Sequence, residues 1–331
     1  MSEVVVIGNG AAGLLAASRL ASCGKEVTVL GRGTPATSLS TSCLDVGDPS
    51  LKAFLLPRLE RQGLRYIGEG LRLITDIGSS FRCLLAPEWM AKADGMRRPE
   101  MVRFPMLQGR ALVDRSTVVG EVVVGSRCFD GCFTLSSLAR SLGSRDGYGE
   151  LLQALSKAGD EILIPPVLER EAMRRLEADL GATVAEAVTP LSAQGRRLHA
   201  AMMEMARAEG AKVLEGREIV GISAEGRVSV RSGMRRSEME AGSIIIATGG
   251  LVTKGLEPEG RRVEFPLIRL RTAGGGVLDS GLLCDADGAV SSEHGTISLI
   301  KAVGEVKHGV WGLSASMEDA WRVAGRFLEE G

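Results

Sequence analysis

The chain has 331 residues, a net charge of −1 at pH 7, and 44% hydrophobic and 24% charged residues, the composition of a soluble globular protein with room for two domains. The small net charge and the aromatic content of 4% argue against a nucleic-acid partner, which calls for a basic surface with stacking side chains. No apolar run approaches the roughly 20 residues of a membrane span, and no signal peptide fits ahead of the first strand, so we expect a cytoplasmic protein.

The N-terminal residues follow the order strand, glycine turn, helix and strand that binds a dinucleotide pyrophosphate. The turn Gly8-Asn9-Gly10-Ala11-Ala12-Gly13 lies between an apolar run at 4–7 and a helical pattern at 14–21. Gly8 permits the tight turn, Gly10 lets phosphates approach the backbone, and Gly13 lets the helix pack on the strand. The N–H groups at the helix start face the anion. We predict a nucleotide site here; the alternative is a Rossmann-like unit kept only for packing.

The second strand, residues 26–30, ends without the carboxylate that usually accepts hydrogen bonds from the adenosine ribose. It runs instead into Gly31-Arg32-Gly33. Arg32 could meet the 2′-phosphate of NADP, or it could lie against an adenine or a pyrophosphate. These alternatives leave the identity of the cofactor open at this point.

Residues 34–48 are rich in serine and threonine and contain Ser40 and Ser42. Such a run is typical of an ordinary loop. In a flavin-binding layout, however, the chain passes close to the flavin ring here, and hydroxyl groups can contact it. Composition favours neither interpretation.

The next segment, residues 51–194, has the alternating pattern of a second α/β domain. We expect helices at 51–73, 135–142, 148–158 and 169–180, strands at 80–85, 121–125 and 160–166, and irregular chain at 88–113. Strands that alternate with helices along the chain imply a parallel sheet. We therefore predict a domain at 51–194, with a substrate or interaction role, inserted into a flavin-binding domain formed by 1–50 and 195–331.

The returning chain completes the predicted nucleotide-binding sheet. We expect a helix at 194–209, a strand at 212–216, a hairpin over 218–231, strands near 281–290 and 296–303, and a final helix at 314–328. The wholly apolar strand at 243–247 ends in Thr248-Gly249-Gly250 and is expected to be buried and parallel. The fold class is thus α/β: a Rossmann-like domain with a parallel sheet and a small β-meander, plus the inserted α/β domain.

The six cysteines do not form a metal-binding pattern. Cys128 and Cys132 stand four residues apart, without a second pair or a neighbouring histidine, whereas zinc and iron–sulfur sites need four suitably spaced ligands. We predict no metal site and no disulfide framework.

Several stretches resemble known flavoproteins. The opening glycine turn, the Ala-Thr-Gly-Gly strand end and Gly304-Glu305 before the last helix resemble the two-dinucleotide-binding flavoproteins. Within that group the chain is similar to the B subunits of anaerobic glycerol-3-phosphate dehydrogenases. The stretches that carry this likeness are 30–33, 40–45, 122–125, 162–165, 194–198 and 215–220. The tail departs from the family: it is shortened at the C-terminus, and its glycine-rich stretch is reduced to 304–313.

The resemblance implies FAD as the cofactor, with FMN as the alternative. It places Gly304 and Glu305 at the ribityl–phosphate arm and Gly249 near the adenosine half. It implies a partner flavoprotein subunit and an iron–sulfur subunit, with reducing equivalents passing from a small hydroxy substrate through flavin toward quinone, at the inner face of the membrane through these partners. Other readings are a non-catalytic scaffold subunit and an NADP-dependent enzyme.

An alcohol substrate needs a base near its hydroxyl, and histidine suits neutral pH. The chain has three histidines. His308 follows Gly304 in the presumed flavin loop and is our candidate base. We expect His199 and His294 to be structural or surface residues.

Overall fold

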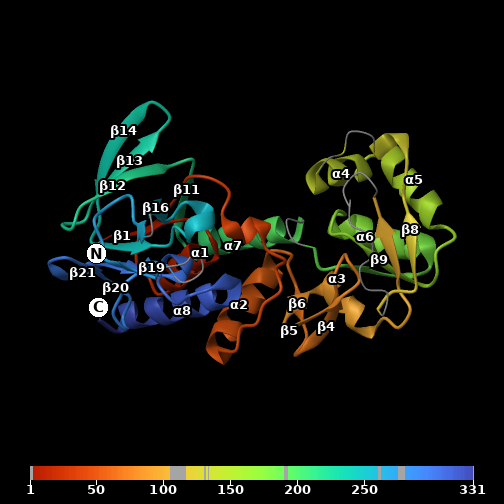
Figure 1. The fold of residues 1–331 in the computed structure, drawn as a ribbon, viewed down its shortest axis with the longest axis horizontal. Helices are drawn as coiled ribbons and strands as arrows, with labels where there is room; N and C mark the ends of the chain where they lie inside the picture. Colours follow the sequence, from red (N-terminus) through yellow and green to blue (C-terminus); the bar gives the residue numbers. More distant parts are fainter. Residues whose placement is uncertain are drawn as a thin grey trace. The chain divides into compact units, whose positions relative to one another are not determined.

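Figure 1 shows the chain as a computed structural model, which describes residues 3–104, 117–129, 132, 134–189, 193–259, 262–274 and 280–330. The chain divides into two compact units. Unit 1 consists of Met1–Thr37, Val46–Gly63 and Leu198–Gly331, and unit 2 consists of Ser38–Asp45 and Leu64–Arg197.

This division departs from the predicted 51–194 insertion at two places. Helix α2 (Pro49–Arg61) belongs to unit 1, where Arg58 pairs with Glu209 at 2.9 Å. Residues 38–45 belong instead to unit 2, because the Leu44 backbone pairs with Leu85. Both differences arise from pairings between residues far apart in the sequence.

Unit 1 is built on a six-stranded sheet in the order β11-β2-β1-β15-β21-β20. The strands are β1 (Val4–Ile7), β2 (Val27–Gly31), β11 (Lys212–Glu215), β15 (Ser243–Ile246), β20 (Ala289–Ser292) and β21 (Gly295–Ala302). All neighbours run parallel except β20 and β21. The two strands at the centre of the sheet, β1 and β15, are apolar except for Ser243, as is typical of parallel strands that are buried on both faces.

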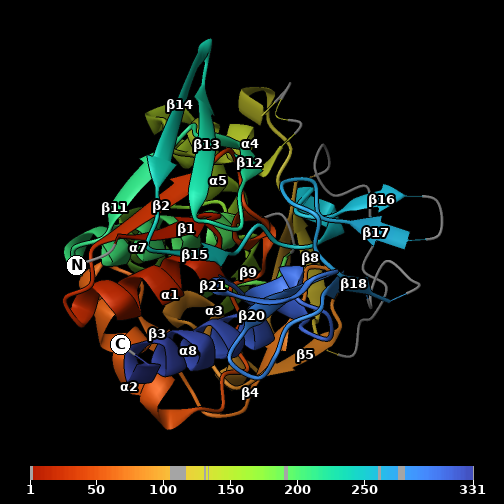
Figure 2. The same ribbon diagram turned by 90° about the vertical axis from the view of Figure 1, so that its left-hand side faces the viewer.

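Helices α1 (Ala11–Ser22) and α8 (Gly312–Glu330) pack side by side in unit 1, as Figure 2 shows. The guanidinium of Arg19 lies 3.6 Å from the ring centroid of Trp321. This contact brings the first and last helices of the chain together and so ties the final segment to the start of the nucleotide-binding pattern.

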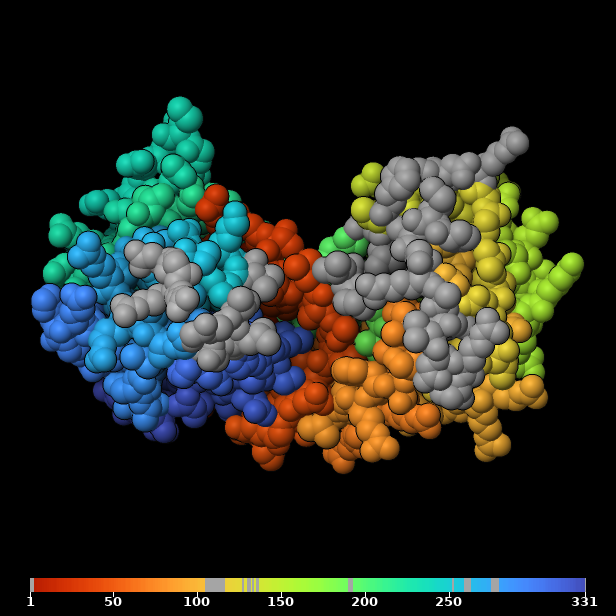
Figure 3. Space-filling view, in the orientation of Figure 1, coloured from red at the N-terminus to blue at the C-terminus, as the bar shows by residue number. Residues whose placement is uncertain are grey.

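The predicted hairpin after β11 is a three-stranded antiparallel meander, β12 (Glu218–Ile222), β13 (Arg227–Ser232) and β14 (Arg235–Glu240). Its far end projects from unit 1 at the upper left of Figure 3. Unit 1 also contains the short strand pairs β16 (Glu257–Glu259) with β17 (Arg262–Glu264) and β18 (Thr272–Ala273) with β19 (Gly281–Leu282).

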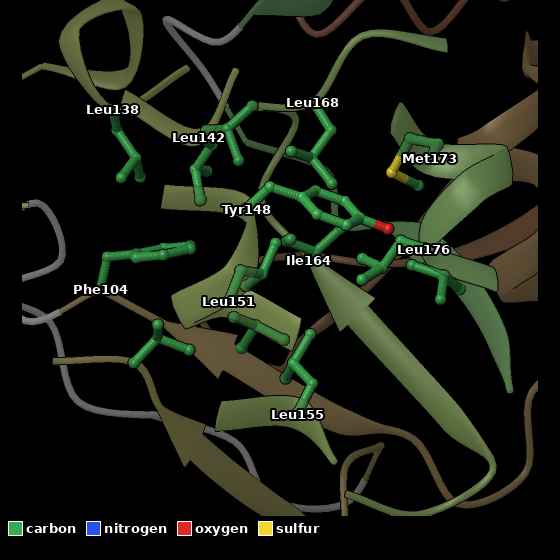
Figure 4. Packing of buried hydrophobic residues seen from close by; sticks show 14 of the residues in the cluster. Phe104, Leu138, Leu142, Tyr148, Leu151, Leu155, Ile164, Leu168, Met173 and Leu176 are labelled. Atoms are coloured by element: carbon green, nitrogen blue, oxygen red, sulfur yellow. The ribbon is translucent and has the colours of Figure 1, made fainter. Parts of the chain in front are cut away.

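Unit 2 contains the predicted second parallel sheet, in the order β10-β9-β7-β8. Its strands are β7 (Glu100–Arg103), β8 (Gly120–Val123), β9 (Glu161–Ile164) and β10 (Thr183–Glu186), and its helices include α4 (Leu135–Leu142), α5 (Arg145–Leu155) and α6 (Arg170–Leu180). Figure 4 shows the core between them, where Phe104, Leu151 and Leu176 are buried with Tyr148. The sheet and its helices confirm the predicted second α/β layer.

The helix predicted over 51–73 is wrong beyond Arg61. The chain turns at Gly63, Gly68 and Gly70, all with positive φ, a conformation that glycine adopts without strain. It then forms two small antiparallel pairs, β3 (Tyr66–Ile67) with β6 (Ala86–Pro87) and β4 (Leu71–Ile74) with β5 (Ser80–Cys83). The region 88–113, predicted to be irregular, contains α3 (Glu88–Ala91) and β7; residues 105–113 of it lie outside the described residues. Helix α7 (Ala193–Ala208) then leads from unit 2 into unit 1.

Candidate cofactor site

Three turns adjoin at the carboxyl end of the unit 1 sheet, where ligands of open parallel sheets bind. They follow β1, β15 and β21. A Cβ at Gly8, which has φ +120°, would lie 2.1 Å from the Ala247 carbonyl oxygen. A Cβ at Gly250 would lie 3.5 Å from the Glu305 carbonyl oxygen. The end of β15 therefore lies between the glycine turn and the last turn.

The turn after β21, which begins at Gly304 and is called the last turn below, also contacts the start of α1 directly. Gly304 has φ +74°, and a Cβ there would stand 2.8 Å from the Cβ of Ala12. A Cβ at Gly13 would meet the Gly8 carbonyl oxygen at 2.1 Å. Gly8, Gly13 and Gly304 are thus required by packing of the protein on itself. The structure brings together six of the predicted site positions, namely Gly8, Ala12, Gly13, Gly249, Gly304 and Glu305.

Gly10 differs from these glycines. It is the N-cap residue of α1, with φ −77°, and as a glycine it has no side chain with which to cap the helix. A Cβ at Gly10 would meet Pro35 and Thr37 at 3.6 Å, an ordinary contact. Packing within the protein therefore gives no reason for glycine at this position. A ligand that approaches the backbone closely does give such a reason, as in dinucleotide turns.

The start of α1 presents the positive pole of the helix dipole. Its first turn holds no acidic residue, and the amide N–H of Ala11 donates to Thr37 Oγ1 at 2.8 Å. The helix dipole favours an anion at this end. The arrangement suits a pyrophosphate.

Two hydroxyl groups of unit 1, Thr248 Oγ1 and Ser316 Oγ, are buried and have no hydrogen-bond partner among the described residues. Ser316 Oγ lies 3.5 Å from the position of a Cβ at Gly304. Burying an unpaired hydroxyl is costly, so a bound polar ligand accounts for both. The residues present therefore fit a dinucleotide. Ser316 was missed by sequence reasoning because a serine near the start of a helix is too common to signal a site.

The last turn is fixed by a buried ion pair. Asp319 of α8 accepts hydrogen bonds from the Gly304 N–H at 3.0 Å and from Lys307 Nζ at 2.8 Å. The Lys307 and Asp319 side chains are only 8% and 6% exposed. Glu305 Oε1 in turn accepts from the Gly312 N–H at 3.0 Å, so this carboxylate caps α8. No short motif marks the Lys307–Asp319 pair in the sequence.

His199 contacts the glycine turn, although we expected a structural or surface residue. Its Nε2 lies 3.0 Å from the Asn9 carbonyl oxygen. The Asn9 side chain lies against Gly31, where a Cβ would be 2.4 Å from Asn9 Cγ. Burial lowers the pKa of His199, and the hydrogen bond to Asn9 opposes this shift. The neutral ring with Nε2 protonated is the form that donates to Asn9 without a charge penalty.

The other predicted residues are exposed on unit 1 or belong to unit 2. Arg32 Nη1 pairs with Glu218 Oε1 at 2.9 Å, and the Arg32 side chain is 75% exposed; Gly33 is also exposed. His308 is exposed, and its backbone N–H donates to the Leu282 carbonyl at 3.1 Å.

Ser40 and Ser42 are in unit 2. Ser42 has φ +62° and a buried hydroxyl with no partner among the described residues, and its carbonyl accepts from Tyr66 Oη at 2.8 Å. A strained backbone with an unpaired hydroxyl is a feature of ligand contacts. Contact of Ser40 and Ser42 with the flavin remains a prediction.

Within the described residues, no group of three or more histidine, cysteine, aspartate or glutamate side chains is placed to hold a metal ion. A search of the same residues finds no helix with the length and apolarity needed to cross a membrane.

Comparison with known proteins defines the class. Residues 3–278 match the model of the FAD-dependent oxidoreductases. The chain belongs to this family, and its cofactor is FAD.

Among individual proteins, the chain is 24% identical to the anaerobic glycerol-3-phosphate dehydrogenase B subunit of Pectobacterium atrosepticum, with 99% of each chain covered. It is 25% identical to the corresponding B subunit of Pectobacterium carotovorum subsp. carotovorum, with the same coverage. Because 99% of the relatives is covered, the shortening expected at the C-terminus is not a loss of that end.

A solved structure with a similar fold is 3-ketosteroid-Δ4-(5α)-dehydrogenase of Rhodococcus jostii RHA1. It is 11% identical, with 98% of this chain and 96% of that chain covered and a TM-score of 0.41. A TM-score this low supports no argument about activity.

Proposed function

We propose that this chain is a flavin-dependent dehydrogenase subunit that passes reducing equivalents from a small hydroxy substrate to a partner protein. The observation that carries the proposal is Gly10, a glycine at the start of α1 that the protein's own packing does not require. The similarity to glycerol-3-phosphate dehydrogenase B subunits supports a multi-subunit complex. We propose a second flavoprotein subunit and an iron–sulfur subunit as its other members.

In this proposal the three adjoining turns hold FAD. The backbone at Gly10 and Ala12 faces the pyrophosphate, and the N-terminal pole of α1 stabilises its charge. Thr248 and Ser316 donate their buried hydroxyls to the polar parts of the cofactor. FAD supplies the hydride chemistry when bound; the chain orients it and excludes water around it.

His308 is the proposed base for the substrate hydroxyl. It lies just beyond the turn that starts at Gly304, and its exposed position leaves the ring accessible to a substrate or a partner. Neutral imidazole accepts a proton at physiological pH. Replacing His308 with Gln should then slow substrate oxidation and leave FAD binding intact.

A second candidate is a scaffold subunit that binds FAD but does not oxidise substrate itself. The observation that favours it is the use of Glu305 as a cap for α8, which engages this carboxylate within the protein. Reduction of the bound FAD by glycerol 3-phosphate in the isolated chain supports the first proposal. Reduction only in the presence of a partner flavoprotein subunit supports the scaffold.

Gly10→Ala tests the cofactor site. A Cβ at this position makes only ordinary contacts within the protein, so we expect a small loss of about 0.5–1 kcal/mol in stability from the poorer N-cap. Overpacking against a ligand costs about 1–3 kcal/mol, which corresponds to a weakening of FAD binding by roughly 5- to 150-fold. The measurement is the dissociation constant of FAD by fluorescence quenching.

Gly149→Ala is the matched control, because nothing lies within 4 Å of a Cβ there. Its FAD affinity should equal that of the unmodified chain. If Gly10→Ala also binds FAD with unchanged affinity, the pyrophosphate does not lie against this turn.

A further inference from the structure

The last residue of β2, Gly31, holds the position at which a dinucleotide site usually carries a ribose-binding carboxylate. Its backbone does not call for glycine, because its φ lies outside the left-handed region. A Cβ at Gly31 would, however, lie 2.4 Å from Cγ and 2.7 Å from Nδ2 of Asn9. The side chain of Asn9 therefore occupies the space that an acidic residue 31 would need.

Asn9 is a buried residue of the turn after β1, and only 6% of it is exposed. His199 Nε2 lies 3.0 Å from its backbone carbonyl oxygen and so fixes the turn at this residue. No hydrogen bond joins the side-chain amide of Asn9 to another of the described residues. Since buried polar side chains are nearly always hydrogen-bonded, a ligand that bonds to this amide accounts for its position.

The charged side chains that follow β2 are engaged with one another. Arg32 pairs through Nη1 with Glu218 Oε1 at 2.9 Å, and its side chain is 75% exposed. The other oxygen of Glu218 is bonded to the guanidinium of Arg231. Both oxygens of this carboxylate are thus held by arginines, and Asn9, rather than Glu218, is the polar side chain that lies at Gly31.

We propose that the Asn9 side chain replaces the missing carboxylate and hydrogen-bonds to the adenosine ribose of FAD. A carboxylate can only accept from ribose hydroxyls, whereas an amide can both accept and donate, and a hydroxyl can do the same. The turn after β1 then binds two neighbouring parts of the cofactor, the pyrophosphate through its backbone and the ribose through Asn9. This inference rests on the proposed FAD site.

A comparison of two cofactors tests the contact. FAD and its 2′,3′-dideoxyadenosine analogue differ only in the two ribose hydroxyls. We expect the unmodified chain to bind FAD more tightly than the analogue, and Asn9→Ala to reduce this preference by about 2- to 12-fold, the effect of one hydrogen bond. The dissociation constants are measured by flavin fluorescence quenching. If Asn9→Ala weakens both cofactors equally, Asn9 acts by packing alone and the proposal is overturned.

Glu218→Gln is the matched control. Its carboxylate is already bonded to Arg32 and Arg231, so the preference for FAD over the analogue should stay as in the unmodified chain. Loss of the preference in Glu218→Gln, with its retention in Asn9→Ala, would assign the ribose to Glu218 and contradict the proposal.

A double variant tests the exchange of roles between the two positions. Gly31→Glu alone should lower both the Tm and the affinity for FAD, because its Cβ collides with the Asn9 side chain. Asn9→Ala combined with Gly31→Glu removes the collision and returns a carboxylate to the end of β2. We expect this pair to recover the Tm and the preference for FAD over the analogue. A double variant no better than Gly31→Glu would count against the proposal.

These results separate the role of Asn9 from the FAD site itself. If the unmodified chain and Asn9→Ala bind FAD with the same preference over the analogue, the proposed site stands and Asn9 has no part in ribose binding. If the unmodified chain binds no FAD, the proposed site and the role of Asn9 are both wrong.

Discussion

At the scale of single residues, the Lys307–Asp319 pair shows how a buried charge can position a backbone turn. Asp319 accepts hydrogen bonds from the Gly304 N–H and the buried Lys307 ammonium, and also from the more exposed Arg322 guanidinium. Removing two charges from water is expensive, so this pair adds little net stability over an apolar substitute. Its contribution is geometric, because it fixes the turn that contacts Ala12 at the start of α1.

Asp319→Asn should destabilise the protein by about 3–5 kcal/mol, because it leaves the Lys307 ammonium buried without a counter-charge. Urea unfolding measures the change. Asp287→Asn is the control: its partner Arg326 lies on the same helix as Asp319, and both side chains of this second pair are well exposed, so the loss should be about 0–1 kcal/mol. Equal losses of stability in the two variants would mean that burial of the Lys307–Asp319 pair does not determine the cost of removing its carboxylate.

His199 gives the protein a pH-dependent contribution to stability. Its pKa in the folded chain is lowered by burial, so the unfolded chain binds the proton more readily. The free energy of unfolding therefore falls as the pH drops below the unfolded-state pKa of about 6.5. The loss levels off once the pH passes below the folded-state pKa.

His199→Gln keeps a donor for the Asn9 carbonyl and does not titrate. The free energy of unfolding should fall less between neutral and mildly acidic pH in this variant than in the unmodified chain. Chemical denaturation of both proteins at the two pH values measures this difference. Carboxyl groups titrate in both proteins and cancel in the comparison. Parallel pH profiles for the two proteins would show that His199 is not the group responsible.

At the scale of elements, the adjoining turns follow from the order of strands in a parallel sheet. The turns after β1, β15 and β21 must meet because these strands are neighbours and point the same way. The glycines at the turns were predictable from local pattern, since a strand followed by glycine spacing and a helix is a specific signal. The hydrogen bonds of Asp319 and His199 to the turns were not, because they join helices and loops far apart in the sequence.

Gly8→Ala should prevent the turn after β1 from packing against the end of β15. Its φ of +120° is strained for any other residue, and the Cβ would lie 2.1 Å from a backbone oxygen. Gly24→Ala is the control, with φ +81° and nothing within 4 Å of the Cβ; it carries only the left-handed backbone penalty of about 1–2 kcal/mol. Thermal unfolding should show a far lower Tm for Gly8→Ala. A similar Tm for both variants would mean that the contact with Ala247 can relax.

At the scale of the whole molecule, the sequence predicts two α/β layers but not their boundaries. The alternation of strand and helix patterns in the sequence correctly predicts the second parallel sheet. Helix α2 was predicted in the wrong unit because the sequence pattern of its apolar face does not tell which unit it packs on. The Arg58–Glu209 pair, which places it in unit 1, joins residues far apart in the sequence. The 38–45 segment was misplaced for a similar reason, since its pairing with Leu85 has no local signal.

The central claim is that FAD lies at the three adjoining turns of unit 1. Hydrogen exchange of the full chain with and without FAD tests it most directly. We predict slower exchange on FAD binding in residues 8–13, 248–250 and 304–306, because a bound dinucleotide shields and fixes these backbone amides. Unchanged exchange in all three segments, in a chain that has bound FAD, would contradict this account.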